Sequence, residues 1–421
     1  MQRAIDGRLA VAQRFAGWMT PRRLAAQAVA LAVCLWSVAA IDFATPGVMD
    51  RAGNVKFQDF LQFYVSGTLL RESQANLLFD EPTAAEQMQA VAPQWKSSLP
   101  RVYGPQVGMF FAPFARFPFL TAAAIWVAVS AGLYLLCCCL IWNTCPGLGE
   151  HQQLRWLLAA AYPPFFHFVV RGQLAALVLA CFVAAYFAFQ AHRPFLAGLA
   201  LGCLVFKPQF LVAIPIVFLL AGAWNSLVGT VLAAAGQLAI AWIGVGTETM
   251  RQYVRTLTNA RRLVATTEVD ALALAQLHSL RSFWAELIPW RGPASFLYFA
   301  SSLAVVCLAV RLWKSDAPLA FRFSGLLLAA VLVNPHLFVY DLLALTPALL
   351  LLGDWCARNP GYPHTPTLWM LLYAVYVLPL LGPLTLFTHL QISVIAMLGL
   401  EWAAWRAAAN LRLAEPGPAS T

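Results

Sequence analysis

Long apolar runs constrain the fold of this chain more than any other feature of its sequence. Charged residues make up only 11% of the 421 residues, and the mean hydropathy is +0.70. Ordinary globular domains carry roughly 25% charged residues, so a soluble fold would have too little polar surface to cover itself. The runs are also too solid for the alternating strands of a transmembrane barrel. The sequence therefore predicts an all-α polytopic membrane protein.

The apolar runs predict about twelve membrane-spanning helices in a single domain that covers residues 1–421. They lie at 24–41, 119–142, 154–169, 174–189, 195–206, 210–223, 227–244, 293–312, 319–333, 337–352, 368–381 and 384–404. Several runs are short, which implies tilt, local thinning of the bilayer or burial inside the bundle. Two polar segments, 44–118 and 245–291, interrupt the series.

Lysine and arginine residues near the short loops predict that both termini are cytoplasmic, because such residues gather on that side of a membrane. The residues used are Arg3, Arg8, Arg14, Arg22, Arg23, Arg155, Arg193, Arg311, Lys314, Arg322, Arg358, Arg406 and Arg412. Both polar segments then lie on the side opposite the cytoplasm. The excess of lysine and arginine in cytoplasmic loops applies mainly to short loops, so a long loop such as 245–291 is largely exempt from it. The net charge of +9 indicates membrane topology and anionic lipid, and no nucleic-acid partner is expected.

The first polar segment contains the leading catalytic candidate. Phe57, Phe60, Leu61 and Tyr64 follow helical spacing, which predicts a helix lying on the membrane surface. Asp59 would then sit at the lipid–water boundary, and we interpret its carboxylate as a catalytic base. The alternative is a solvated aspartate on an interfacial helix. Tyr64, on the same predicted helix, is a candidate for substrate binding.

Other polar residues fall on the same outer face in this topology. Tyr103 in YGP belongs to the first polar segment, and the ends of spans supply Arg171 and Gln173 in RGQ, Lys207 in KPQ, and His336 in NPH. Random loop polarity would scatter over both faces, so the pattern favours one external site. The alternatives are cations that snorkel to the headgroups, a glutamine that satisfies the backbone, and a packed histidine.

This set of residue types suits sugar transfer from a polyprenyl-phosphate donor. The acceptor hydroxyl needs a base such as Asp59, and the departing phosphate needs a cation. Lys207 and Arg171 lie at membrane depth, where a cation without an anionic partner is costly, and a phosphate would be such a partner. Arg251 and Arg255 lie four apart and could guide phosphate or an acidic acceptor. No metal-ligand spacing is present, so neither a metal nor another cofactor is expected.

Several motifs together resemble glycosyltransferase family 87. The resemblance runs from about Asp59 to about Asp341 and rests on DFxxFY, LFDEP, YGP followed by FAPFA, GQ, AGLALGCLVFKPQ and NPHLFVYD. It implies a GT-C-like bundle that takes mannose from polyprenyl phosphate and passes it, with inversion, to a glycan or glycolipid. It also implies that Asp59 is the general base and that His336 lines the active site. The chain departs at Tyr103, where YGP replaces the YPP that the family often has.

Two other functions stay open: a lipid-linked-sugar flippase or solute transporter, and a polymerase or ligase that uses a pyrophosphate-linked donor. The expected location is the bacterial inner membrane, with the site on the periplasmic side. The sugar, the acceptor and the linkage are undetermined. So is the participation of Arg251, Arg255, Arg262 or Asp341, and Asp341 has the alternative of pairing within the bundle.

Overall fold

The computed structural model describes residues 11–95, 99, 102–266 and 275–414. Within these residues every regular element is a helix, and β-type pairing is limited to two isolated bridges, Met49–Val55 and Leu277–Phe338. Seven of the described helices are long and apolar enough to cross a membrane, and four shorter apolar helices accompany them. The chain is an all-α polytopic membrane protein, as the sequence predicted.

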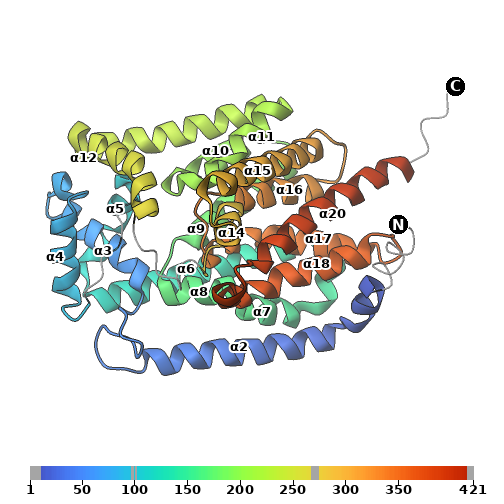
Figure 1. Cartoon of the computed structure of the whole chain (residues 1–421), viewed down its shortest axis with the longest axis horizontal. Coiled ribbons are helices and arrows are strands. Elements are labelled where there is room, and N and C mark those ends of the chain that lie inside the picture. The colour runs from blue at the N-terminus through green and yellow to red at the C-terminus, as the bar shows by residue number, and fades with distance from the viewer. Residues whose placement is uncertain (1–10, 96–98, 100–101, 267–274, 415–421) are drawn as a thin grey trace.

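The first span, α2 (Pro21–Phe43), lies along one side of the bundle (Figure 1). Only 6% of its apolar window is buried inside the protein. Trp36 ties it to the bundle, because the indole Nε1 donates a hydrogen bond to the carbonyl of Ala160 at 2.9 Å. A helix with this much uncovered apolar surface needs lipid around it, which agrees with its role as a membrane span.

The first polar segment folds into a compact group of short helices at one end of the molecule (Figure 1). These are α3 (Gln58–Arg71), η1 (Ala75–Leu77), α4 (Glu81–Val91), α5 (Pro105–Phe111) and η2 (Phe114–Arg116). Asp80 caps α4, since its carboxylate accepts a hydrogen bond from the Thr83 amide at 3.0 Å.

The prediction that α3 lies on the membrane surface is wrong, because the helix is buried in protein. Its buried residues surround the helix, and Phe60 and Phe63 are 0% and 1% exposed. Phe63 stacks on Phe111 of α5 with ring centroids 5.2 Å apart. The apolar spacing in the sequence correctly indicated that this helix is buried. However, the helix is covered by α5 and its neighbours and not by lipid.

The central part of the chain supplies spans and broken helices. They are α6 (Phe119–Trp142), η3 (Pro146–His151), α7 (Gln152–Ala161), α8 (Pro163–Arg171), α9 (Ala175–Gln190), α10 (Pro194–Gly202), η4 (Cys203–Phe206), η5 (Pro208–Leu211) and α11 (Ala213–Ala221). The run 154–169 is two helices rather than one span. The break falls at Tyr162, because Pro163 and Pro164 lack the amide hydrogens that would continue α7.

The longest described helix, α12 (Trp224–Thr266), bends at Gly246, where φ is 81° and ψ is 170°. Its second part turns over the first polar segment (Figure 1), and the Tyr253 ring stacks on Phe79 at 5.6 Å. The predicted span 227–244 is therefore continuous with the start of the second polar segment.

The last part of the chain forms the core and one flank. Its helices are α14 (Leu280–Leu287), α15 (Arg291–Trp313), α16 (Leu319–Leu332), η6 (Val339–Leu345), α17 (Thr346–Arg358), α18 (Thr365–Val377), η7 (Leu378–Leu384), α19 (Thr385–Thr388) and α20 (Ile392–Ala414). Within the described residues, the span formed by η6 and α17 has 89% of its apolar window buried, the largest share of any span. η6 is therefore an element enclosed by other helices.

The loop between α16 and η6 is held by the segment that precedes α14. The His278 amide donates to the Leu337 carbonyl at 2.8 Å, and the Val339 amide donates to the Gln276 carbonyl at 2.8 Å. His278 is itself buried, with its ring 2.7 Å from the Ser393 hydroxyl. This pairing fixes the NPH loop at the entrance to η6.

Candidate active site

A left-handed turn holds the end of α8 against the start of α3. α8 ends at Arg171, and Gly172 follows with φ of 68°, a conformation that other residues rarely adopt. A Cβ atom on Gly172 would lie 2.8 Å from the Phe60 Cβ, so glycine permits the close approach. The Trp126 indole donates to the Gly172 carbonyl at 3.0 Å and locks the turn. Arg171 and Gln173, on either side of it, therefore lie beside α3.

Asp59 and Arg171 form a loose ion pair. Asp59 is the second residue of α3, where the helix dipole favours a carboxylate. The Arg171 Nη1 atom lies 3.7 Å from the Asp59 Oδ1 atom, and the two side chains are 29% and 11% exposed. The guanidinium also donates to the Gln58 and Gln276 side chains at 3.0 and 3.2 Å. The pair is held in place but is open on one side.

Gln173 joins Asp59 to two tyrosines. Its Nε2 atom donates to the Asp59 Oδ2 atom at 2.9 Å and to the Tyr340 hydroxyl at 3.1 Å. Its Oε1 atom accepts from the Tyr103 hydroxyl at 3.3 Å. Burial raises the pKa of Tyr103 to about 12, so this hydroxyl keeps its proton and can donate. Gln173 is 1% exposed, and its carboxamide is the centre of a polar cluster.

Lys207 and Asp341 form a second, sealed ion pair in the same cluster. The Lys207 Nζ atom lies 2.5 Å from the Asp341 Oδ1 atom, and the side chains are 1% and 2% exposed. Lys207 sits between the short helices η4 and η5, and its Nζ atom lies 5.0 Å from the centroid of the Tyr340 ring. We expected a phosphate to be the anionic partner of Lys207, whereas in the structure its partner is Asp341. The interpretation that Asp341 pairs within the bundle is confirmed.

His336 lies at the edge of this cluster. Its backbone amide donates to the Asn334 Oδ1 atom at 2.9 Å, and its ring meets Phe338 edge-on with centroids 4.9 Å apart. Burial, followed by the positive charges of Arg281 and Lys207, lowers the pKa of His336 from 6.5 to about 4. The imidazole is therefore neutral at neutral pH.

Comparison with protein families identifies the chain. The model of glycosyltransferase family 87 matches residues 102–335, which is more than half of the 421 residues. The chain belongs to glycosyltransferase family 87. Searches of curated proteins and of solved structures found no match. This protein is therefore a membrane-embedded glycosyltransferase.

The family match covers part of the cluster in this glycosyltransferase. Tyr103, Arg171, Gln173 and Lys207 lie inside the matched range. Asp59 precedes it, and the residues from His336 onward follow it. The cluster is thus assembled from the matched segment and from the chain on either side of it.

The structure brings six of the eight candidate residues near one another and leaves two apart. Tyr64 lies farther along α3, where its hydroxyl donates to the Phe117 carbonyl at 2.9 Å. Arg255 is exposed on the second part of α12. Its neighbour Arg251 is also exposed and pairs with Glu248 at 3.5 Å. The side chain of Arg262 lies outside the described residues. Among the described residues, no group of three or more acidic, histidine or cysteine residues could hold a metal.

Sequence reasoning missed four residues of the cluster: Gln58, Gln276, Phe338 and Tyr340. Phe338 and Tyr340 belong to the NPHLFVYD motif, and their rings stack with centroids 5.3 Å apart. The NPHLFVYD motif indicated a functional segment, but only its histidine and its aspartate were predicted to take part, because aromatic residues in an apolar run usually pack. Gln276 carried no signal, because only the bridge to the NPH loop brings it to Arg171.

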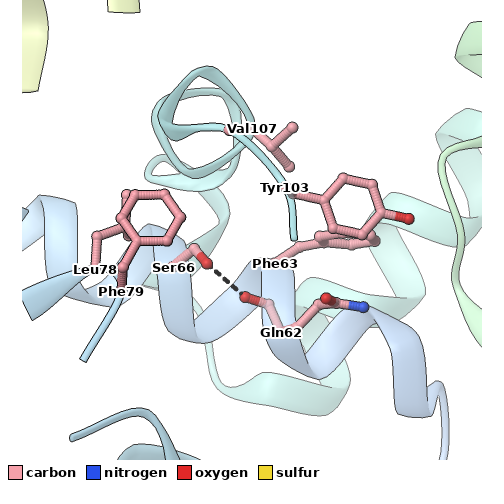
Figure 2. Close-up of a pocket in the computed structure, with 8 residues that line it drawn as sticks. Gln62, Phe63, Ser66, Leu78, Phe79, Tyr103 and Val107 are labelled. Atoms are coloured by element: carbon pink, nitrogen blue, oxygen red, sulfur yellow. Dashed lines mark hydrogen bonds between the residues drawn. The ribbon is translucent and has the colours of Figure 1, made fainter. Parts of the chain in front are cut away.

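A small hollow adjoins the cluster on the other side of Tyr103 (Figure 2). It is lined by Gln62, Phe63, Ser66, Leu78, Phe79, Tyr103, Gly104 and Val107. The Ser66 hydroxyl donates to the Gln62 carbonyl at 2.7 Å, and Tyr103 meets Phe63 edge-on at 4.9 Å. In Figure 2 the Tyr103 hydroxyl points away from Leu78 and Phe79. This hydroxyl is the group that donates to Gln173.

Proposed function

We propose that this family 87 glycosyltransferase moves a hexose from a polyprenyl-phosphate donor to a glycan or glycolipid acceptor, with mannose as the first sugar to test. Asp59 acts as the general base, and the transfer inverts the anomeric centre. The observation that carries the proposal is the pair formed by Asp59 and Arg171, in which a largely buried carboxylate lies beside a partly open guanidinium.

The surroundings of Asp59 suit a base. The start of α3 and the Gln173 amide hold its carboxylate in one orientation, while 11% of the side chain stays accessible. In the proposed step Asp59 takes the proton of the acceptor hydroxyl as that oxygen attacks C1 of the donor sugar. The bond from C1 to the phosphate oxygen breaks with its electron pair, and polyprenyl phosphate leaves.

Arg171 is a better partner for the departing phosphate than Lys207. Its side chain is 29% exposed, whereas that of Lys207 is 1% exposed and already neutralised by Asp341. A planar guanidinium can bind a phosphate through two hydrogen bonds, and stabilising developing charge is a large catalytic effect. Lys207 then contributes to the field of the site without touching the donor.

The acceptor would approach from the side of the hollow shown in Figure 2. Its lining combines the aromatic rings of Phe63, Phe79 and Tyr103 with the polar side chains of Gln62 and Ser66. No cation is among these residues, which favours an uncharged sugar over a phosphate there. The neutral His336 lies on the Lys207 side of the cluster and lines the site without carrying charge.

The proposed location follows from the charge distribution in the sequence. The site faces the periplasmic side of a bacterial inner membrane, and both termini are cytoplasmic. A lipid-linked donor fits that side, because its sugar is delivered in the outer leaflet without a nucleotide. The GT-C-like arrangement expected from the family resemblance is part of the same proposal.

A liposome assay tests the function. Purified protein is reconstituted with defined polyprenyl-phosphate hexoses and extracted acceptor, and the product is identified by its mass. The Asp59→Asn variant should lose about 10²–10⁴-fold of the transfer rate, as expected for a general base, and should keep the wild-type melting temperature.

Three outcomes would overturn the proposal. Full activity of Asp59→Asn would remove this carboxylate from the mechanism. Movement of the donor across the bilayer without a new glycosidic bond would indicate a flippase. Transfer from pyrophosphate-linked donors alone would indicate a polymerase or ligase.

A further inference from the structure

Tyr340 lies between the two ion pairs of the cluster. Its hydroxyl accepts a hydrogen bond from the Gln173 Nε2 atom at 3.1 Å, and its ring lies 5.0 Å from the Lys207 Nζ atom. Its ring also stacks on Phe338, with centroids 5.3 Å apart. Tyr340 is 5% exposed, so these contacts define its surroundings. The proposed mechanism gives Tyr340 no role of its own.

The hydrogen bonds of Gln173 determine which way its carboxamide points. The Leu174 backbone N–H lies 3.2 Å from the Oε1 atom, and a backbone N–H can only donate. The atom near Leu174 is therefore the oxygen, and the Nε2 group faces the other side. Its two hydrogens then have one acceptor each, Asp59 at 2.9 Å and Tyr340 at 3.1 Å.

The sealed ion pair in turn holds Tyr340. Tyr340 and Asp341 are consecutive residues of η6, and the Lys207 ammonium contacts both of them. Lys207 bonds to Asp341 at 2.5 Å and lies near the tyrosine ring. A continuous series of contacts thus runs from the Lys207–Asp341 pair through Tyr340 and Gln173 to Asp59.

We propose that Tyr340 is a positioning residue for Asp59 and acts through Gln173. Its hydroxyl accepts a hydrogen bond from one N–H of the Gln173 amide. This keeps the other N–H directed at the Asp59 carboxylate. Without the hydroxyl, the carboxamide is free to rotate, and Asp59 loses a partner that stabilises and orients its charged form. The inference rests on the proposed function, since it assigns a role toward the proposed base.

The Tyr340→Phe variant tests the inference, because it keeps the ring beside Lys207 and removes only the hydroxyl. We expect kcat to fall about tenfold, roughly the effect of one buried hydrogen bond, with KM for donor and acceptor unchanged within about twofold. The acidic limb of the pH profile of kcat/KM should move to higher pH, because the carboxylate has lost a hydrogen bond that favours its charged form.

The Tyr134→Phe variant is the matched control. It loses a buried hydroxyl that donates to the Ala159 carbonyl at 3.0 Å, and Ala159 is not part of the cluster around Asp59. Its kcat and pH profile should match the wild type.

A double variant shows whether Tyr340 works through Gln173. In a Gln173→Leu background, adding Tyr340→Phe should lower kcat by less than twofold more, since the connection is already cut. A wild-type kcat and pH profile for Tyr340→Phe, or effects that multiply in the double variant, would overturn the inference while leaving hexose transfer intact. Full activity of Asp59→Asn would instead overturn the proposed function and the inference with it.

Discussion

Two ion pairs share one polar cluster, yet they differ in length and in exposure. The Arg171–Asp59 pair is 3.7 Å long, and its side chains are 29% and 11% exposed. The Lys207–Asp341 pair is 2.5 Å long, and its side chains are 1% and 2% exposed. A loose and open pair can exchange one partner for a substrate, whereas a tight and sealed pair cannot do so without a large rearrangement.

The contrast shows that residue type and local motif do not decide the role of a cation. RGQ and KPQ look alike in the sequence, since each places a cation two residues before a glutamine at the end of an apolar run. Of these two cations, only Arg171 keeps part of its side chain exposed. Lys207 is neutralised by an aspartate that lies 134 positions away along the chain.

Breaking the sealed pair should have the largest effect on stability. The Asp341→Asn substitution leaves the Lys207 ammonium buried without a counter-charge, which typically costs about 3–5 kcal/mol of stability. We expect a marked fall in the melting temperature in detergent, followed by loss of activity.

The double variant Lys207→Met with Asp341→Leu is the control for that prediction. It removes both charges at similar volume and should recover most of the melting temperature, since apolar replacement of a whole buried pair is often nearly neutral. A single variant as stable as the wild type would show that Lys207 does not depend on Asp341.

Changing the open pair should affect activity and spare stability. The Arg171→Gln substitution should lower kcat/KM for the donor about 100-fold, as expected when a preorganised donor to a developing charge is lost. The melting temperature should change little, because partly exposed ion pairs contribute about 0–1 kcal/mol. The matched control is Arg193→Gln, an exposed arginine before α10. Equal losses of activity in both variants would contradict the special role of Arg171.

The smallest expected effect concerns His336, which lies beside the cluster and is neutral in the folded state. Its pKa falls from 6.5 to about 4 because of burial and the nearby Arg281 and Lys207 charges. Between these values the unfolded chain binds a proton that the folded chain does not, so stability rises with pH across this window. The contribution of neutral His336 to the free energy of unfolding is complete above about pH 6.5 and is lost as the pH falls toward 4.

The His336→Gln variant should therefore melt with a shallower pH dependence between pH 4 and 6.5 than the wild type. Melting curves in detergent at several pH values measure the difference. His278 also has a pKa lowered by burial, to about 3, so the wild-type slope includes its contribution and only the difference between the two proteins is informative. Identical slopes would show that His336 titrates as a solvated histidine.

Most spans could be predicted because a continuous apolar run has few ways to fold in a membrane. The run 293–312 is the helix α15 (Arg291–Trp313), within two residues at each end. The run 154–169 failed as a single helix because two prolines divide it at Tyr162. α3 was placed on the surface because its apolar spacing does not reveal whether lipid or protein covers it.

The candidate site could be predicted in part because its motifs are polar residues where apolar runs end. Arg171, Gln173, Lys207 and His336 were predicted in this way, and Asp59 and Tyr103 were predicted from the first polar segment. These six residues lie close together. Tyr64 and Arg255 were predicted from helical spacing, and Tyr64 also from the DFxxFY pattern. They lie apart, since helical spacing says nothing of the direction in which a helix presents its side chains.

The sequence by itself determined that the chain is embedded in a membrane, that it is helical, and that polar residues lie at the ends of its spans. These properties follow from composition and periodicity, which act locally along the chain. Only the tertiary structure decided which cation is sealed and which is open, and which tyrosine joins the two pairs. Partners such as Lys207 and Asp341 are far apart in sequence, and the helices between them choose the pairing by how they pack.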